Sequence, residues 1–170
     1  MTEPRRESGE EAVGIPTLEA IRHLLITADV PFVQKHHEPT LTSEASAQAR
    51  GEPLKIGAKA LVVKCDDQFR LFVLPADRKL DSSAVKRLLG VRKLRFADAA
   101  ELLSLTGLVP GSVPPFGPPV LSLELTADLA LLENDRVAFN AGSLTTSIVM
   151  SSADYRRVAG AQWSTVSQAP

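Results

Sequence analysis

Five of the twelve prolines of this 170-residue chain fall between residues 110 and 119, with Gly111 and Gly117 among them. Proline fixes the backbone angle φ and lacks an amide donor, whereas glycine adopts angles that other residues avoid. The cluster occupies the second half of residues 102–123, a charge-free span long enough to suggest a membrane helix. The prolines would break such a helix. The pattern predicts a helix end, a rigid loop and a strand.

The same loop is a candidate site. Residues 111–117 read Gly-Ser-Val-Pro-Pro-Phe-Gly, so amide groups remain at Ser112 and Val113, next to Pro114. Amide groups held in a rigid loop can face a ligand oxygen. We therefore predict that this loop contributes to binding or catalysis.

The composition is that of an ordinary globular domain, with 44% hydrophobic and 23% charged residues. We expect residues 1–14 to form a disordered polar leader, residues 15–163 one domain, and residues 164–170 a flexible tail. The leader has no apolar stretch after its arginines, so we expect no signal peptide and no membrane anchor. Cys65 is the only cysteine, which excludes an internal disulfide and indicates a cytoplasmic protein.

The order of predicted elements favours the α+β class. Strands and helices are mixed without the regular alternation of a doubly wound sheet, and two apolar runs separated by residues 66–68 predict a central hairpin. We expect one domain with a mixed sheet of about six to seven strands surrounded by helices. The expected helices are 17–28, 43–49, 81–89, 98–107 and one starting at 151, and the expected strands are 32–36, 58–64, 69–74, 94–97, 120–125, 137–140 and 147–150.

Lys59 stands out inside an apolar strand. It shares one face of the strand with Leu61 and Val63, so it interrupts a row of side chains that favour burial. For an arbitrary lysine the favoured interpretation is a side chain that reaches solvent at an edge. The alternative is an amine placed for function.

A second candidate feature is a turn of small polar residues after the strand 137–140. Asn140, Gly142 and Ser143 lie there, and their neutral groups could bind a ligand, although such a sequence usually forms only a turn. His36 and His37 are adjacent and point to opposite faces of a strand, so they cannot form a one-face metal pair. We predict neither a metal site nor a cofactor.

Familiar catalytic motifs are absent from the sequence, including the phosphate-binding loop, the dinucleotide fingerprint, the nucleophile elbow and the zinc helix. No obvious general base accompanies the conspicuous residues. Hydrolysis would therefore depend on positioning, on stabilisation of an oxyanion by backbone amides, and on help from the substrate.

Charge is unevenly distributed along the chain. The net charge is −1, but residues 51–100 contain eleven Lys and Arg against six Asp and Glu. Arg78, Lys79, Lys86 and Arg87 belong to this excess and could contact a phosphate backbone. A solvated helix face with an exposed strand is the equally acceptable alternative.

These features together resemble the YbaK/ProX family, the trans-editing relatives of the insertion domain of bacterial prolyl-tRNA synthetase. The resemblance also rests on Thr-Ser-Glu-Ala at 42–45 and Leu-Pro-Ala-Asp at 74–77, and it covers residues 17–160. Members of that family have an α+β domain with a mixed sheet and hydrolyse the ester of mischarged aminoacyl-tRNA. The resemblance therefore implies a deacylase, with aminoacyl-tRNA and an aminoacyl-tRNA synthetase as partners.

The resemblance also implies roles for individual residues. Lys59 would engage the substrate near the tRNA 3′ end, and Gly111 and Ser112 would stabilise the oxyanion. The 2′-hydroxyl of the terminal adenosine, or a water that it orders, would replace a protein base. The pocket around the acyl group would be lined by Val113, Pro114, Asn140, Gly142 and Ser143, and tRNA would contact Arg78, Lys79, Lys86 and Arg87.

Two departures from the family pattern bear on the substrate. Some relatives carry Thr or Asn where this chain has Ala60, and relatives linked to alanine specificity carry His where this chain has Asn140. The sequence is more similar to members that act on seryl or threonyl errors, so we expect a small amino acid of the Ser, Thr or Ala type. Two alternatives stay open: a non-catalytic module that binds tRNA or a synthetase, and hydrolysis of a small acyl or nucleotide ester without tRNA.

Overall fold

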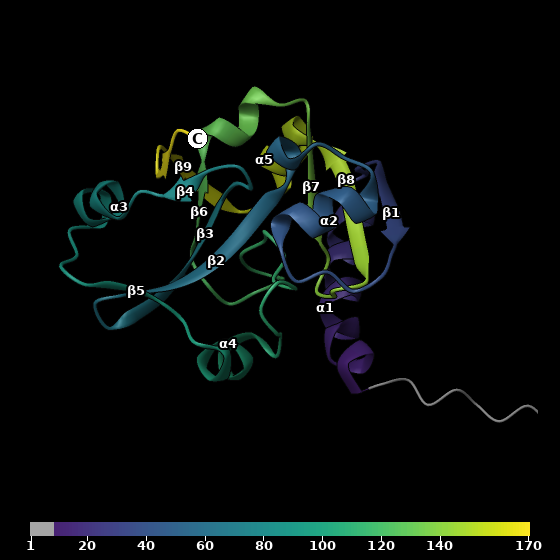
Figure 1. Ribbon diagram of the computed structural model, residues 1–170, viewed down its shortest axis with the longest axis horizontal. Helices are drawn as coiled ribbons and strands as arrows, with labels where there is room; N and C mark the ends of the chain where they lie inside the picture. The colour runs from purple at the N-terminus through teal and green to yellow at the C-terminus, as the bar shows by residue number, and fades with distance from the viewer. Residues whose placement is uncertain (1–8) are drawn as a thin grey trace, which may run out of the picture.

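The computed structural model describes the backbone of residues 9–170 and the side chains of residues 15–170. Its larger sheet has five strands in the order β5-β2-β3-β6-β9 (Figure 1). The hairpin pair β2 and β3, and the neighbouring β5, run antiparallel, whereas β6 and β9 continue parallel to β3. The bounds are β2 Ala58–Cys65, β3 Gln68–Pro75, β5 Leu94–Phe96, β6 Leu125–Asp128 and β9 Ala161–Ser164.

A second, antiparallel sheet has the order β1-β8-β7, and a short ribbon pairs β4 with β10. A single bridge between Gly57 and Ala138 connects the start of β2 to β7. The predicted α+β class is confirmed, but the strands are divided among these sheets and not gathered in one. The bounds are β1 Phe32–His36, β4 Lys79–Leu80, β7 Arg136–Asn140, β8 Thr146–Ser151 and β10 Ser167–Gln168.

Helix boundaries follow local capping chemistry. The side chains of Thr42, Asp81, Asp98 and Ser151 each accept the amide hydrogen that an N-cap residue should accept, and Asp98 and Glu101 form a complete capping box. All four of these helix starts were predicted from their capping residues. The helices are α1 Gly9–Thr27, α2 Ser43–Arg50, α3 Ser82–Leu89, α4 Ala99–Thr106 and α5 Ser152–Val158, with short 3₁₀ turns η1 Leu54–Ile56 and η2 Leu129–Glu133.

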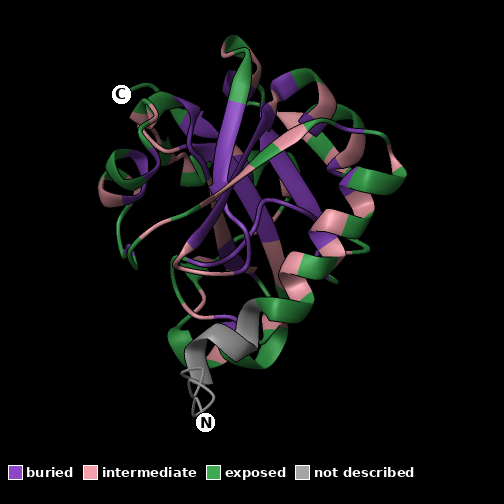
Figure 2. Ribbon diagram, turned by 90° about the vertical axis from the view of Figure 1, so that its right-hand side faces the viewer, coloured by how far each residue is buried: buried purple, intermediate pink, exposed green. Residues whose placement is uncertain are grey.

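The core consists of two main clusters on opposite faces of the larger sheet. Val62 of β2 belongs to the main cluster, which α1, α5 and the second sheet also enclose, while Val63 belongs to a smaller cluster beneath α3. Neighbouring residues of one strand thus serve different cores. Figure 2 shows that the strand ribbons at the centre of the molecule are mostly buried. No helix in the described part of the chain is long and apolar enough to cross a bilayer.

Two elements begin more than two residues away from their predicted start. The first helix begins at Gly9 and not at Thr17, because Glu-Glu-Ala at 10–12 favours helix and Pro16 is accommodated within it. Residues 9–14 of the expected leader are therefore helical, and residues 1–8 lie outside the described residues. The strand expected at 120–125 begins only at Leu125, because the amides of Val120 and Leu121 donate to the Gly117 carbonyl in a turn.

The expectation of a flexible tail at 164–170 was wrong. Val166 is fully buried, and β10 pairs with β4. The reason is a buried carboxylate at the end of β6: Asp128, 1% exposed, accepts the amides of Val166 and Ser167 at 2.8 and 3.1 Å and the Ser167 hydroxyl at 2.7 Å. This carboxylate fastens the C-terminal segment to the sheet.

Replacing Asp128 with Ala should lower the free energy of unfolding by about 2–4 kcal/mol, because buried amides at 166 and 167 would lose their acceptor. Urea unfolding followed by circular dichroism measures this change. Asp67→Ala, at an exposed position in the β2–β3 turn, is the control and should change the free energy by less than about 0.5 kcal/mol. Equal values for both variants would contradict the fastening role of Asp128.

Candidate active site

An open cavity of about 190 Å³ lies where α2, the start of β2, the proline-rich loop and the end of β7 meet. It is smaller than the roughly 300–1,000 Å³ typical of sites for drug-sized ligands, so it suits a small group. Of the predicted site residues, the structure brings Lys59, Gly111, Val113 and Asn140 together here. The full lining is Thr40, Leu41, Thr42, Ser43, Ser46, Arg50, Gly57, Ala58, Lys59, Ala60, Leu61, Ala76, Gly111, Val113, Ala138, Phe139 and Asn140.

The Lys59 side chain lies at the wall of this cavity and not free in solvent. It is half-buried, and its Nζ donates a hydrogen bond to the carbonyl oxygen of Arg78. Burial lowers the pKa of Lys59, the nearby Lys79 acts in the same direction, and Glu44 and Asp77 oppose the shift. The amine therefore stands among protein groups that hold it beside the cavity.

The proline-rich loop is anchored in the main core by an aromatic side chain. Phe116 is fully buried and meets Phe139 and Tyr155 edge to face, with ring centroids 5.3 and 5.6 Å apart. The buried Tyr155 hydroxyl donates to the Pro115 carbonyl at 2.6 Å, and burial raises the pKa of Tyr155. These contacts give the loop a fixed position relative to β7 and α5.

A side-chain amide fixes the other end of the loop. Asn140 Nδ2 donates to the Gly111 carbonyl at 2.8 Å, while its Oδ1 accepts from the Ser147 hydroxyl at 3.1 Å and from Arg50 Nη2 at 3.3 Å. Gly111 has φ +88°, a conformation that L side chains rarely adopt. Asn140 thus lines the cavity, but protein partners occupy its amide, so its visible role is to hold the loop.

Other residues predicted for the site do not line the cavity. The Ser112 amide donates to the Val109 carbonyl at 3.1 Å and its hydroxyl donates there at 2.8 Å, so neither group faces a ligand as expected. Pro114 and Gly142 are buried outside the cavity lining, and Ser143 bonds within its own turn, to Thr145. The amides of Gly111 and Val113 have no acceptor among residues 9–170, and these two residues do line the cavity.

None of the four predicted tRNA-binding residues lines the cavity. Arg78 pairs with Glu133 at 3.4 Å, and its carbonyl receives Lys59. Lys79 is exposed on β4, and Lys86 and Arg87 are exposed on α3, which Figure 1 shows well apart from α2. Their contact with tRNA stays a prediction.

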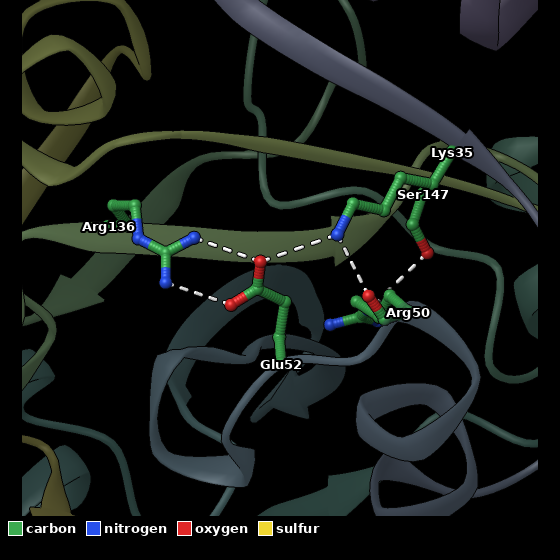
Figure 3. A network of polar contacts seen from close by, with 5 residues as sticks. All are labelled: Lys35, Arg50, Glu52, Arg136 and Ser147. Atoms are coloured by element: carbon green, nitrogen blue, oxygen red, sulfur yellow. Dashed lines mark hydrogen bonds and ion pairs between the residues drawn. The ribbon is translucent and has the colours of Figure 1, made fainter.

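Arg50 is a site residue that sequence reasoning missed. It ends α2 and is only 8% exposed, and its Nε donates to the Ser147 hydroxyl at 3.2 Å (Figure 3). Burial lowers its pKa to about 10, and Glu52 opposes that shift. A basic residue in the last turn of a helix ordinarily complements the helix dipole in solvent. Only the packing of α2 against β7 and β8 reveals that this one is buried.

The cavity wall contains no carboxylate and no imidazole. Among the described residues there is also no group of three or more His, Cys, Asp or Glu that could hold a metal ion. The lining residues carry several hydrogen-bond donors: the Lys59 ammonium, the Arg50 guanidinium, the amides of Gly111 and Val113, and the hydroxyls of Thr40, Thr42, Ser43 and Ser46. Such a set can bind and polarise an oxygen, but it supplies no protein base.

Comparison with known proteins shows the family to which the chain belongs. The model of the aminoacyl-tRNA editing domain family matches residues 37–158, and the chain belongs to this family. The multifunctional Ser/Thr-tRNA deacylase ProXp-y of Escherichia coli K12 is 38% identical over 157 residues, which cover 88% of this chain and 92% of that protein. The predicted resemblance to the trans-editing deacylases is confirmed.

Two further relatives extend the comparison. A crystal structure described as a candidate trans-editing enzyme for prolyl-tRNA synthetase superimposes with a TM-score of 0.76 at 26% identity, covering 91% of this chain and 98% of that one. The proline–tRNA ligase of Nitrosomonas eutropha is 28% identical over 139 residues, which are 75% of this chain but 24% of the ligase. The ligase therefore contains a related domain within a longer chain.

The lowered pKa of Lys59 can be measured directly. We expect the side-chain carbon resonance of Lys59 to titrate with a midpoint below the ordinary value of 10.5, because burial disfavours the charged amine. NMR of protein with ¹³C-labelled lysine gives the midpoint, and Lys59→Met assigns the signal. A midpoint at or above 10.5 would contradict the half-buried position of this amine.

Proposed function

We propose that the protein is a free-standing deacylase that hydrolyses the ester of tRNA mischarged with a small amino acid. The observation that carries this proposal is that Lys59, Gly111 and Val113 line one small cavity, and that the amides of Gly111 and Val113 have no acceptor among the described residues. The chain belongs to the editing domain family, and its E. coli relative is named a Ser/Thr-tRNA deacylase. Ser and Thr are therefore the first amino acids to test.

The geometry supports a mechanism in which the protein positions the ester and stabilises charge. The acyl group enters the cavity, and the amides of Gly111 and Val113 donate to the carbonyl oxygen as it becomes an oxyanion. Lys59 holds the terminal nucleotide by exchanging its contact with the Arg78 carbonyl for one with the substrate. A water attacks the acyl carbon, and the bond from that carbon to the 3′-oxygen of the terminal adenosine then breaks. Because the wall has no base, the proton of the water passes through the 2′-hydroxyl, or a second water that it orders, to the departing 3′-oxygen.

Arg78 and Lys79 are the nearest candidates for tRNA contacts, because Lys59 bonds the backbone of Arg78. Lys86 and Arg87 would extend the same contact along the acceptor stem, from the exposed face of α3. We further propose a cytoplasmic location and delivery of substrate by a synthetase, as the matches to proline–tRNA ligases suggest.

The activity is tested by incubating the protein with tRNA charged with Ser, Thr, Ala, Cys or Pro. We expect loss of the seryl or threonyl ester faster than its spontaneous hydrolysis, and a fall of about 10²-fold in kcat/KM for Lys59→Ala, because the substrate loses a positioning contact. Lys64→Ala is the control, since Lys64 lies on the same strand over the Phe69 ring and outside the cavity. It should retain activity within about twofold.

If every ester is lost only at its spontaneous rate, the proposed deacylase activity is wrong. Saturable tRNA binding in that case would support the alternative, a non-catalytic binding module, which the lack of a base in the wall leaves open. Turnover of a simple acyl ester without tRNA would instead favour a small-molecule esterase.

Gly111→Ala tests the loop. A Cβ there would lie 3.2 Å from Leu144 Cδ2, which must give by a few tenths of an ångström, and φ +88° is strained for any L side chain. We expect the backbone to relax away from this angle, which changes the direction of the loop amides. We expect a fall of about 10²-fold in kcat with a loss of about 1–2 kcal/mol in stability. Gly90→Ala, at φ +65° with nothing within 4 Å, is the matched control and should lose similar stability but no activity. Full activity of Gly111→Ala would contradict the oxyanion role of the loop.

A further inference from the structure

Arg50 is a buried cation that forms no ion pair with a carboxylate of the described residues. The carboxylate that acts on it among them, Glu52, binds Arg136 through two 2.9 Å contacts and Lys35 at 3.4 Å (Figure 3). The Arg136 bond is the largest cause that lowers the pKa of Glu52, so this carboxylate is already neutralised. Buried charges are costly unless they are paired. The position of Arg50 therefore calls for an explanation beyond stability.

One nitrogen of the Arg50 guanidinium is available to a ligand. Nε donates to Ser147 and Nη2 donates to Asn140, whereas Nη1 has no acceptor among the described residues. Nη1 lies on the cavity side, because a Cβ built at Gly57, a lining residue, would be 3.9 Å from it. The two held nitrogens fix the plane of the guanidinium and aim the third into the cavity.

The lining of the cavity combines polar and apolar side chains around the guanidinium. The buried hydroxyls of Thr40 and Ser46 line it and contact each other at 2.7 Å. Ala58 and Ala138 add only methyl groups to the lining, and Ala138 pairs with Gly57, the residue beside Nη1. A small group with one hydroxyl and an otherwise apolar side chain would match this lining.

We propose that Arg50 is the specificity residue that recognises the side-chain hydroxyl of a seryl or threonyl group. This inference rests on the proposed function and adds the residue that selects the substrate. A guanidinium only donates hydrogen bonds, so it requires an oxygen acceptor and repels the α-ammonium of the aminoacyl group. The ester carbonyl is placed at the amides of Gly111 and Val113, which leaves the side-chain hydroxyl for Nη1.

A tRNA phosphate does not fit this position. The cavity of about 190 Å³ admits a small group and not a nucleotide, and Arg50 is nine-tenths buried. An alanyl group would place a methyl against Nη1 and leave that donor unbonded. A site built to bond a substrate hydroxyl rejects the analogue that lacks it, because its buried polar group stays unpaired.

The test uses amides that cannot be hydrolysed as esters: 3′-amino-3′-deoxyadenosine acylated with L-serine or with L-alanine. Isothermal titration calorimetry should show that the wild-type protein binds the seryl amide about 10- to 100-fold more tightly than the alanyl amide. Arg50→Gln should reduce this preference to within about twofold while changing the affinity for the alanyl amide by less than about threefold.

Arg136→Gln is the matched control, since it removes another guanidinium from the same network outside the cavity and should keep the preference. If Arg50→Gln does not fold, Arg50→Lys replaces it. The lysine ammonium is a single nitrogen and lacks the planar fork that spans Asn140, Ser147 and the cavity, so the preference should still fall by at least about threefold.

Equal wild-type affinity for the two amides, no binding of either, an undiminished preference in the folded Arg50 variant, or an equal loss for both amides in Arg50→Gln would each overturn the inference. The last result would mean that Arg50 only supports the fold or the carbonyl. Because the amides do not turn over, a failure of deacylation would remove the proposed activity and leave this recognition standing. If the wild-type protein shows no preference for the seryl amide, the role of Arg50 is wrong but the proposed deacylase activity is unaffected.

Discussion

The hydrogen bond from Asn140 to the Gly111 carbonyl is the interaction on which the site depends. It joins the proline-rich loop to the end of β7 at 2.8 Å, while Phe116 holds the same loop from the core. Between these two fixed points the prolines leave little backbone freedom. The amides of Gly111 and Val113, which have no acceptor among the described residues, are therefore held in one position, as the proposed stabilisation of a developing charge requires.

Small residues create the space that these groups surround. Gly57 stands where a Cβ would lie 2.9 Å from Ala76 Cβ and 3.1 Å from the Leu54 carbonyl, so no larger residue fits without displacement. Ala58 and Ala138 keep the neighbouring wall shallow. The result is a cavity with many donors and no base, an arrangement suited to a substrate that brings its own hydroxyl to the reaction.

Much of the fold could be predicted because it follows from local chemistry. Thr42, Asp81 and Asp98 start their helices where a capping side chain should, and the two Leu- and Val-rich runs around residues 66–68 form the expected hairpin. Lys59 and the proline-rich loop were identifiable because each breaks its local pattern. We expected them to meet at one site. The packing of β2 beside β7 is the contact that brings them to one cavity.

The remaining features depend on contacts distant in sequence. Asp128 fastens residues 166 and 167 across almost forty positions, so the segment looked like a polar tail. Nothing in the sequence sets Arg50 apart from other basic residues at helix ends, and its burial depends on Ser147 and Asn140. Ser112 was predicted to be a free donor, but its amide bonds the Val109 carbonyl within its own turn. In each case the position of the residue depends on a partner far along the chain, or on a turn geometry that the composition does not reveal.

The most direct measurement is a crystal structure of the protein with the seryl amide of 3′-amino-3′-deoxyadenosine. We expect the acyl carbonyl to lie within hydrogen-bond distance of the Gly111 and Val113 amides, with the nucleoside beside Lys59. An analogue bound with its carbonyl turned away from the loop, or bound outside this cavity, would contradict the proposed site.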